Sequence, residues 1–239
     1  MKRLILEKLN LKRASGTPVA LVTELSKGRQ TLVDESDNAY GANLPSNITI
    51  IVKNCLLADS NSIIEHDENA YFVRSYNPPI ELYIVGAVHI TQSLAYIARM
   101  AGYNVNIVDP RQGFANPDRF PDLKISNDWP DDYFKEIHLT NRAAIITLSH
   151  DPKIDDPALE YALESPVFYI GSLGSKRTHS KRLSRLKSLG FLDTQLSRIH
   201  SPIGLDIAAK SPAEIAISIM AEITNVRNVT LKQQGNVSR

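Results

Sequence analysis

The order of apolar segments and glycines predicts an α/β protein, in which a parallel sheet carries helices on both faces and a small α+β domain precedes it. Between residues 80 and 228, apolar segments of strand length alternate with segments of helix length, which is the pattern that builds such a sheet. Residues 1–77 read instead as one short helix followed by strands. The segment Asn77-Pro78-Pro79 forms a stiff, extended linker between the two parts.

The N-terminal part begins with a helix. Leu4, Ile5, Leu9 and Leu11 recur at roughly helical spacing, and the segment Ser15-Gly16-Thr17-Pro18 ends this helix. Beyond it we expect strands at residues 19–25, 30–33, 48–52, 62–64 and 70–73.

The larger part alternates between strands and helices. Strands are expected at residues 81–85, 104–108, 143–148 and 167–170, and helices at 86–100, 131–139, 157–163, 176–189 and 211–227. The last helix has a clear start, because Ser211 can cap it, Pro212 suits its first position and Glu214 completes a capping box. This Rossmann-like order places ligands at the carboxyl ends of the strands. Residues 229–239 are polar and predict a flexible tail.

Composition excludes several classes of protein. The 27 basic and 26 acidic residues leave a net charge of +1, which indicates neither nucleic acid nor an anionic membrane as an obligatory partner. The longest apolar runs are too short to cross a bilayer, and charges at Glu7 and Lys8 interrupt the apolar core that a signal peptide needs. Cys55 is the only cysteine, which excludes an internal disulfide and a multi-cysteine metal site. We therefore expect a cytoplasmic protein.

The loop after the first strand of the larger part is a candidate cofactor site. Gly86 begins this loop. A dinucleotide-binding fingerprint requires a second glycine at the position of Val88, because the backbone approaches the pyrophosphate there. Asp109 ends the next strand, where such folds place a ribose-binding carboxylate. An NAD(P)-dependent oxidoreductase is therefore an alternative that Asp109 favours and Val88 opposes. His89, at the helix start, is either a cofactor contact or a surface or capping residue.

Two further loops place charged side chains at the same predicted edge. Arg111 follows Asp109-Pro110, and it either binds a phosphate or carboxylate or pairs with Asp109 to order the loop. His150 follows the buried strand at 143–148, and a histidine with carboxylates nearby suits proton transfer or a weak metal site. The competing interpretation is a loop that only caps the next helix. Asp155 or Asp156, just before Pro157, is expected to cap the next helix.

The strongest chemical signal is a strand, a glycine-containing loop and a basic helix start. Backbone N–H groups, a helix dipole and two cations converge there, which is how proteins bind phosphate. The expected anion-binding residues are Gly171, Gly174, Ser175, Lys176 and Arg177. A solvated basic helix face accounts for Lys181, Arg182, Arg185 and Lys187. In the last loop, Gly204 allows a tight turn and Asp206 either contacts a ligand or caps locally.

Together these loops resemble the XdhC/CoxI family, the accessory proteins of molybdenum hydroxylases. The matching stretches occur in the family's order and are residues 84–90, 108–111, 149–155, 169–177 and 202–220. The resemblance implies a non-catalytic chaperone that binds molybdenum cofactor, a pterin with a terminal phosphate. It implies protection of the cofactor during sulfuration by a cysteine desulfurase, delivery to an apo-enzyme such as xanthine dehydrogenase, and a homodimer. No metal site and no catalytic residue is expected in the chain itself.

Three departures from the family pattern stand out. The family usually has glycine where Val88 and Ala208 stand. Residues 14–20 look like the start of the family's N-terminal domain, but its Gly-Gly-Cys segment is missing, and Cys55 is expected to be a buried structural thiol. A nucleotide-sensing module without chemistry remains a further alternative, and the client enzyme is not indicated by the sequence.

Overall fold

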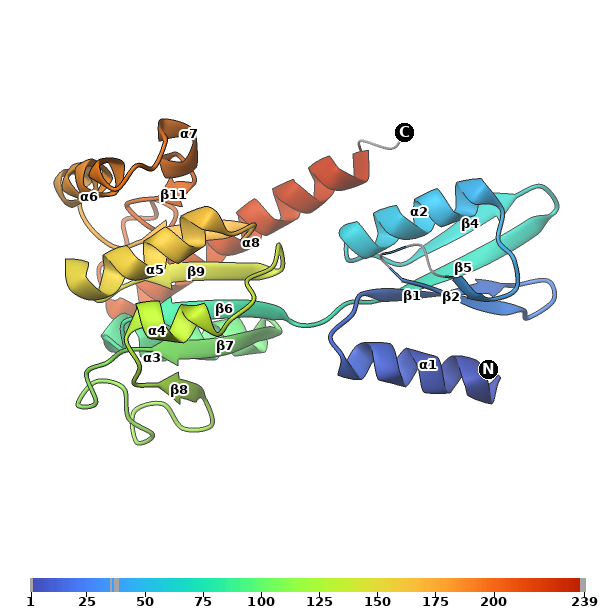
Figure 1. Cartoon of the computed structure of the whole chain (residues 1–239), viewed down its shortest axis with the longest axis horizontal. Helices are drawn as coiled ribbons and strands as arrows, with labels where there is room; N and C mark the ends of the chain where they lie inside the picture. Colours follow the sequence, from blue (N-terminus) through green and yellow to red (C-terminus); the bar gives the residue numbers. More distant parts are fainter. Residues whose placement is uncertain (1, 35, 37–38, 237–239) are drawn as a thin grey trace. The chain divides into compact units, whose positions relative to one another are not determined.

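The computed structural model describes residues 2–34, 36 and 39–236, with side chains described up to residue 230 (Figure 1). The chain divides into two compact units, each with its own sheet. One unit comprises Pro79–Arg227, and the other comprises the residues before it together with the C-terminal end of the chain from Asn228.

The first unit is an antiparallel sheet with a helix on each face. Its strands, in spatial order, are β3 (Ala39–Gly41), β2 (Gln30–Asp34), β1 (Val19–Glu24), β5 (Asn69–Tyr76) and β4 (Ser62–His66). Residues along β1 alternate between the faces, as a pleated strand requires. Ala20 and Val22 pack with helix α2 (Ser46–Leu57), whereas Val19 and Leu21 pack with helix α1 (Arg3–Ala14).

The strand predicted at residues 48–52 is wrong, because these residues lie in α2. The run of β-branched residues there suggested a strand. However, Ile48, Val52, Cys55 and Leu56 are buried at spacings of four, three and one, which is the apolar face of a helix. Tertiary packing of this face outweighs the modest helix propensity of isoleucine and valine. Cys55 is buried in this helix, and its burial raises the pKa of the thiol.

The second unit confirms the predicted parallel α/β fold. All of its six strands run parallel: β11 (Ile199–His200), β10 (Tyr169–Ser172), β9 (Ala143–Thr147), β6 (Ile80–Val85), β7 (Tyr103–Val108) and β8 (Lys124–Ser126), in spatial order. Helices α3 (His89–Met100) and α8 (Pro212–Asn236) pack on one face. The opposite face carries α4 (Pro130–Lys135), α5 (Pro152–Glu164), α6 (Lys176–Ser188) and α7 (Asp193–Leu196).

Alternating residues of the central strands fill the two cores. Leu82 and Ile84 of β6 belong to the core under α3 and α8, and Tyr83 and Val85 belong to the core under α4 and α5. Because every strand of this sheet runs in the same direction, the loops after β6, β7, β9 and β10 meet at one edge. This geometry places the candidate site.

Several helix boundaries differ from the prediction. Helix α5 begins at Pro152 rather than Pro157, and its cap is Asp151, whose side chain accepts a hydrogen bond from the Lys153 N–H at 3.0 Å. Asp155 and Asp156 therefore lie inside the helix and do not cap it. Two Asp–Pro starts occur five residues apart in the sequence, and the structure uses the first.

The C-terminal helix is longer than predicted. Its capping box forms as expected, with the Ser211 hydroxyl accepting from the Glu214 N–H and the Glu214 carboxylate accepting from the Ser211 N–H. The helix continues to Asn236, so the flexible tail expected at residues 229–239 is largely helical, and its last three residues lie outside the described part. Within the described residues, no helix is long and apolar enough to span a membrane.

Candidate functional site

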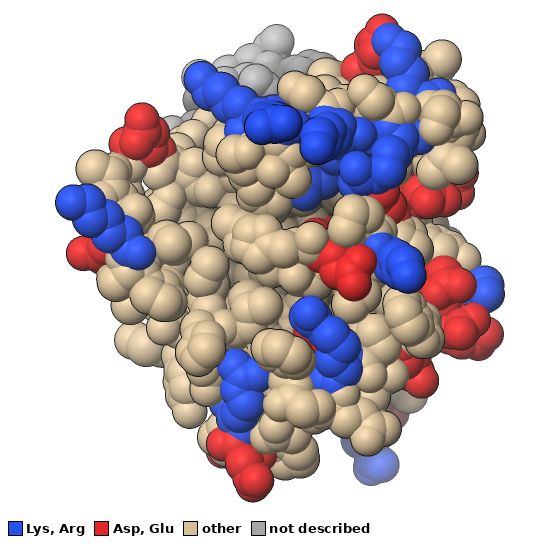
Figure 2. Space-filling view, turned by 90° about the vertical axis from the view of Figure 1, so that its left-hand side faces the viewer, with Lys and Arg blue, Asp and Glu red and all other residues tan. Residues whose placement is uncertain are grey.

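The loops at the carboxyl edge of the parallel sheet form the candidate site. Figure 2 looks onto the end of the molecule where α6 lies, and Lys and Arg side chains form a continuous band there. Carboxylates lie at one end of this band (Figure 2). The contacts that each loop makes show which of the predicted residues lie at this site.

The turn after β6 holds the edge together. Gly86 has φ +110°, and a Cβ at this position would lie 2.6 Å from the backbone nitrogen of Ser149, so only glycine fits. The next N–H, that of Ala87, donates to the Asp109 carboxylate at 2.7 Å. Val88 caps α3 in an extended conformation at φ −84°, which any residue adopts, so the valine causes no strain. His89 is exposed and does not cap this helix.

Asp109 and Arg111 form an ion pair. Arg111 donates through Nε at 2.8 Å and Nη2 at 2.7 Å, and its backbone N–H donates at 3.0 Å. Burial would raise the pKa of the Asp109 carboxyl, but these bonds and the one from Ala87 outweigh it and hold the pKa below its usual range. Both carboxylate oxygens accept these bonds and the residue is fully buried, so no acceptor is left for a ribose hydroxyl in this arrangement. The cofactor contact expected of Asp109 stays a prediction.

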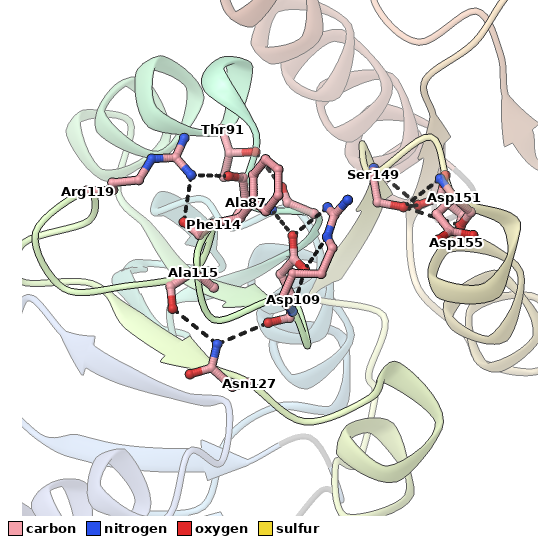
Figure 3. A network of polar contacts seen from close by, with 12 residues as sticks. Ala87, Thr91, Asp109, Phe114, Ala115, Arg119, Asn127, Ser149, Asp151 and Asp155 are labelled. Carbon is pink, nitrogen blue, oxygen red and sulfur yellow. Dashed lines mark hydrogen bonds and ion pairs between the residues drawn. The ribbon is translucent and has the colours of Figure 1, made fainter.

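The loop after β9 carries a second buried carboxylate. The Ser149 hydroxyl and N–H donate to Asp155 at 2.7 and 3.2 Å (Figure 3). Asp155 is 2% exposed, and burial raises the pKa of its carboxyl to about 6 despite these hydrogen bonds. His150 is exposed and adopts φ +65°, a left-handed conformation that costs a non-glycine residue about 1–2 kcal/mol. Such strain at a loop tip is typical of functional positions.

A pocket of about 250 Å³ opens between this loop and α6. Four basic side chains line it, together with His150 and the carboxylates of Asp155 and Asp156; the basic ones are Arg177, Lys181, Arg182 and Arg185. Arg177 and Lys181 have no ion-pair partner among the described residues. The pocket therefore offers positive charge that no described residue neutralises.

The deeper arginines give this pocket a fixed wall. Arg185 binds Asp156 through Nε and Nη2 in a bidentate ion pair. Arg182 is only 2% exposed and donates to the Leu173 carbonyl at 2.9 Å and to the Ser201 hydroxyl at 3.3 Å. Its buried Nε has no partner within the described structure. The prediction that Arg182 lies on a solvated helix face is therefore wrong, whereas Arg185 keeps 41% of its side chain exposed.

The glycine-containing segment after β10 differs from the predicted anion loop. Gly171 lies within the strand, and a Cβ there would lie 2.5 Å from Ile203 and 2.7 Å from the ring of Tyr169, so this glycine serves packing. Ser175 caps α6 by accepting a hydrogen bond from the Thr178 N–H at 3.2 Å. Gly174 has φ +143° and precedes this cap.

The two cations predicted at the start of α6 lie in different surroundings. Lys176 and Arg177 are both exposed, but Arg177 lines the pocket and Lys176 does not. Of the predicted site residues, the structure thus brings His150 and Arg177 together at the pocket, whereas Gly86, Asp109 and Arg111 form the neighbouring framework.

The last loop contributes a network that was not predicted. Glu222 of α8 accepts from the Gly204 N–H at 2.8 Å, from the Tyr169 hydroxyl and from His200 at 3.2 Å. Gly204 has φ +93°, and Ser218 leaves no room for a side chain there. Asp206 is exposed and accepts a 3.5 Å hydrogen bond from Ala208, so it acts as a local cap. No group of three or more metal-ligating side chains occurs in the described part of the chain.

Fold and site together define a Rossmann-type domain with a basic pocket at its sheet edge, and the comparisons agree with this class. The family model for the XdhC Rossmann domain matches residues 82–223, so the chain belongs to the XdhC family. The molybdenum cofactor insertion chaperone PaoD of Escherichia coli is 31% identical over 156 residues, 65% of this chain and 43% of that protein. The protein YqeB of Escherichia coli is 29% identical over 161 residues, 66% of this chain and 29% of that protein.

Two further relatives come from bacilli. A probable xanthine dehydrogenase subunit of Bacillus subtilis is 29% identical over 157 residues, 65% of this chain and 46% of that protein. The crystal structure of a xanthine dehydrogenase from Bacillus halodurans superposes with a TM-score of 0.76 at 26% identity, over 98% of this chain and 69% of that one. The matches to the three curated relatives span less than half the length of each.

Proposed function

We propose that this protein binds molybdenum cofactor and delivers it to a molybdenum hydroxylase, without catalysing a reaction of its own. Family membership supports this role, as do the names of two relatives, an insertion chaperone for this cofactor and a probable xanthine dehydrogenase subunit. The observation that carries the proposal is the basic pocket, in which Arg177 and Lys181 lack ion-pair partners among the described residues.

The chemistry of this pocket fits the terminal phosphate of the cofactor. A phosphate dianion accepts several charge-assisted hydrogen bonds, and guanidinium groups offer paired donors for them. Arg177 and Lys181 are exposed cations of this lining, and the buried Arg182 adds positive charge to its wall. A volume of about 250 Å³ holds the phosphate and its adjoining atoms, so the pterin extends beyond the pocket.

The finer parts of the proposal concern sulfuration and assembly. The single cysteine, Cys55, is buried and the pKa of its thiol is raised by burial, so it is unsuited to carry sulfur. We therefore assign sulfur transfer to a separate cysteine desulfurase that acts on the bound cofactor. We further propose that the protein acts in the cytoplasm as a homodimer.

The geometry gives the oxidoreductase and nucleotide-sensing alternatives less support. A dinucleotide in the standard pose needs the amide of Ala87 and the carboxylate of Asp109, and these two groups bind each other. Opening that pair would also break the bonds from Arg111 and leave a buried carboxylate without its cation. We therefore propose that NAD(P) is not the ligand.

Anaerobic gel filtration tests the proposal directly. Purified protein is mixed with molybdenum cofactor, and molybdenum and pterin are measured in the protein peak. We expect both to co-elute with the protein, and the loaded protein to activate an apo-xanthine dehydrogenase. Folded protein that retains neither molybdenum nor pterin would refute the proposed function. Tight binding of NAD(H) under the same conditions would favour the oxidoreductase instead.

A further inference from the structure

Another pocket lies wholly within the N-terminal unit. Its volume is about 880 Å³, and its walls are the start of α1, the turn between β1 and β2, and the end of β3. Four basic residues line it, and these are Lys2, Lys8, Lys27 and Arg29. Among the described residues, no Asp or Glu lines it. The pocket proposed for the cofactor lies in the other unit and shares no lining residue with this basic groove.

The groove has fixed walls. Helix α1 is anchored by Ile5 and Leu9, which are buried against the sheet. At the opposite wall, Gly41 has φ +140° and comes so close to the backbone of Gln30 that no side chain fits between them. The lining also includes apolar surface, because Leu4 is 65% exposed and the Tyr40 ring lies beside the groove. A preformed groove lowers the entropic cost of binding.

Most of the positive charge in the groove is not neutralised. Lys8 lies 3.7 Å from the centre of the Tyr40 ring, and neither it nor Lys2 pairs with a carboxylate among the described residues. Lys27 and Arg29 share one carboxylate, Glu24, at 3.8 and 2.5 Å. Four cations line the groove and one carboxylate adjoins it, so the described residues contribute three net positive charges there. Such a field attracts an acidic partner.

We propose that this groove docks an extended acidic segment of a partner protein, with one apolar side chain of that segment against Leu4 and Tyr40. The edge of the sheet supports an extended segment over a small anion. In the described sheet β3 has a neighbouring strand on one side only, so its outer backbone groups can pair with an added strand. Leu4 and Lys8 lie one helical turn apart on α1, so the groove presents an apolar and a basic contact side by side.

A defined peptide tests the docking site. The probe is a fluorescein-labelled peptide of nine residues, glutamates and aspartates around a central Leu-Phe pair, titrated with the full chain and followed by fluorescence anisotropy. We expect saturable binding that weakens as salt rises from about 50 to about 300 mM. The double substitution Lys8→Glu and Lys27→Glu should weaken binding by about tenfold or more, since it turns two attractions into repulsions.

Matched controls separate this groove from general charge. Lys124→Glu makes the same change on the exposed edge strand of the other unit, and we expect it to alter binding by less than about twofold. Circular dichroism checks the fold of each variant. If the double variant folds poorly, Lys2→Glu replaces it in the test, and we expect this single substitution to weaken binding as well. Absence of saturation at about 1 mM protein, or equal effects of Lys8→Glu and Lys124→Glu, would overturn the proposal. Displacement of the peptide by equimolar ATP would also overturn it, in favour of a small phosphate ligand.

Discussion

At the scale of single residues, two buried carboxylates at the sheet edge differ in their surroundings. Asp109 accepts from a guanidinium and two backbone N–H groups, which hold its pKa below the usual range. Among the described residues, Asp155 accepts hydrogen bonds from Ser149 alone, and burial raises its pKa from 3.8 to about 6. Asp109 therefore stabilises the loop framework as a permanent anion, whereas Asp155 changes charge near neutral pH beneath the basic pocket.

The raised pKa of Asp155 predicts a pH-dependent stability. A carboxyl whose folded pKa lies above its unfolded pKa stabilises the fold most below pH 3.8, and this contribution is lost as pH rises through about 6. Asp155→Asn abolishes this titration. Relative to wild type, we expect the variant to gain on the order of 3 kcal/mol in unfolding free energy between pH 3.8 and pH 7. Urea unfolding, followed by the fluorescence of Trp129, measures the unfolding free energy of both proteins at each pH. If the two free energies changed with pH in parallel, the raised pKa of Asp155 would be contradicted.

A second prediction concerns Ala208, which stands where the family usually has glycine. Ala208 has φ +56°, a left-handed conformation that is costly for alanine and free for glycine. We expect Ala208→Gly to raise the unfolding free energy of this unit by about 0.5–1 kcal/mol. The control is Ala213→Gly on the exposed first turn of α8, which should lower it by about 0.5 kcal/mol. If both substitutions changed the unfolding free energy in the same direction, the left-handed conformation of Ala208 would be contradicted.

Sequence reasoning reached some of these residues and not others. The caps at Ser175 and Ser211 follow from local sequence, because a cap is defined by its neighbours in the chain. The burial of Arg182 does not, because nothing in the pattern of α6 distinguishes it from the solvated Lys187. Only the packing of α6 on the sheet makes that difference.

At the scale of elements, the strands and helices of the parallel sheet follow from the sequence better than those of the N-terminal unit. Helix α3 and strand β7 lie close to the predicted places. In that segment the spacing of the apolar residues and the positions of the glycines indicate the same elements. Helix α2 was predicted as a strand, since its apolar face is made of β-branched residues. The short β8 and β11 were not predicted, because pieces of two or three residues gain their pairing from the neighbouring strand.

The helical assignment of α2 can be tested by paired substitutions. Ile48 is fully buried and Ile50 is 55% exposed, whereas a strand buried on both faces would bury both. Ile48→Ala should lower the unfolding free energy of the N-terminal unit by about 2–4 kcal/mol, and Ile50→Ala by less than about 0.5 kcal/mol. Hydrogen exchange of the α2 amides measures both. Similar losses for the two variants would contradict the helix.

At the scale of the whole molecule, two units divide the proposed tasks. The Rossmann-type unit belongs to the XdhC family and carries the pocket proposed for the cofactor. The N-terminal unit carries the basic groove proposed for an acidic partner. The fold class could be predicted because the alternation of strands and helices runs through the whole larger unit. The pocket could not, because residues far apart in the chain, at the end of β9 and along α6, meet only in the folded protein.

The most direct test of the central claim uses two adjacent residues. Arg177 lines the pocket and Lys176 does not, although both are exposed cations at the start of α6. The measurement is the dissociation constant of molybdenum cofactor for wild type, Arg177→Ala and Lys176→Ala under anaerobic conditions. We predict that Arg177→Ala weakens binding by about 1–3 kcal/mol and that Lys176→Ala leaves the affinity within about twofold. Unchanged affinity in Arg177→Ala, or equal losses in both variants, would contradict binding at this pocket.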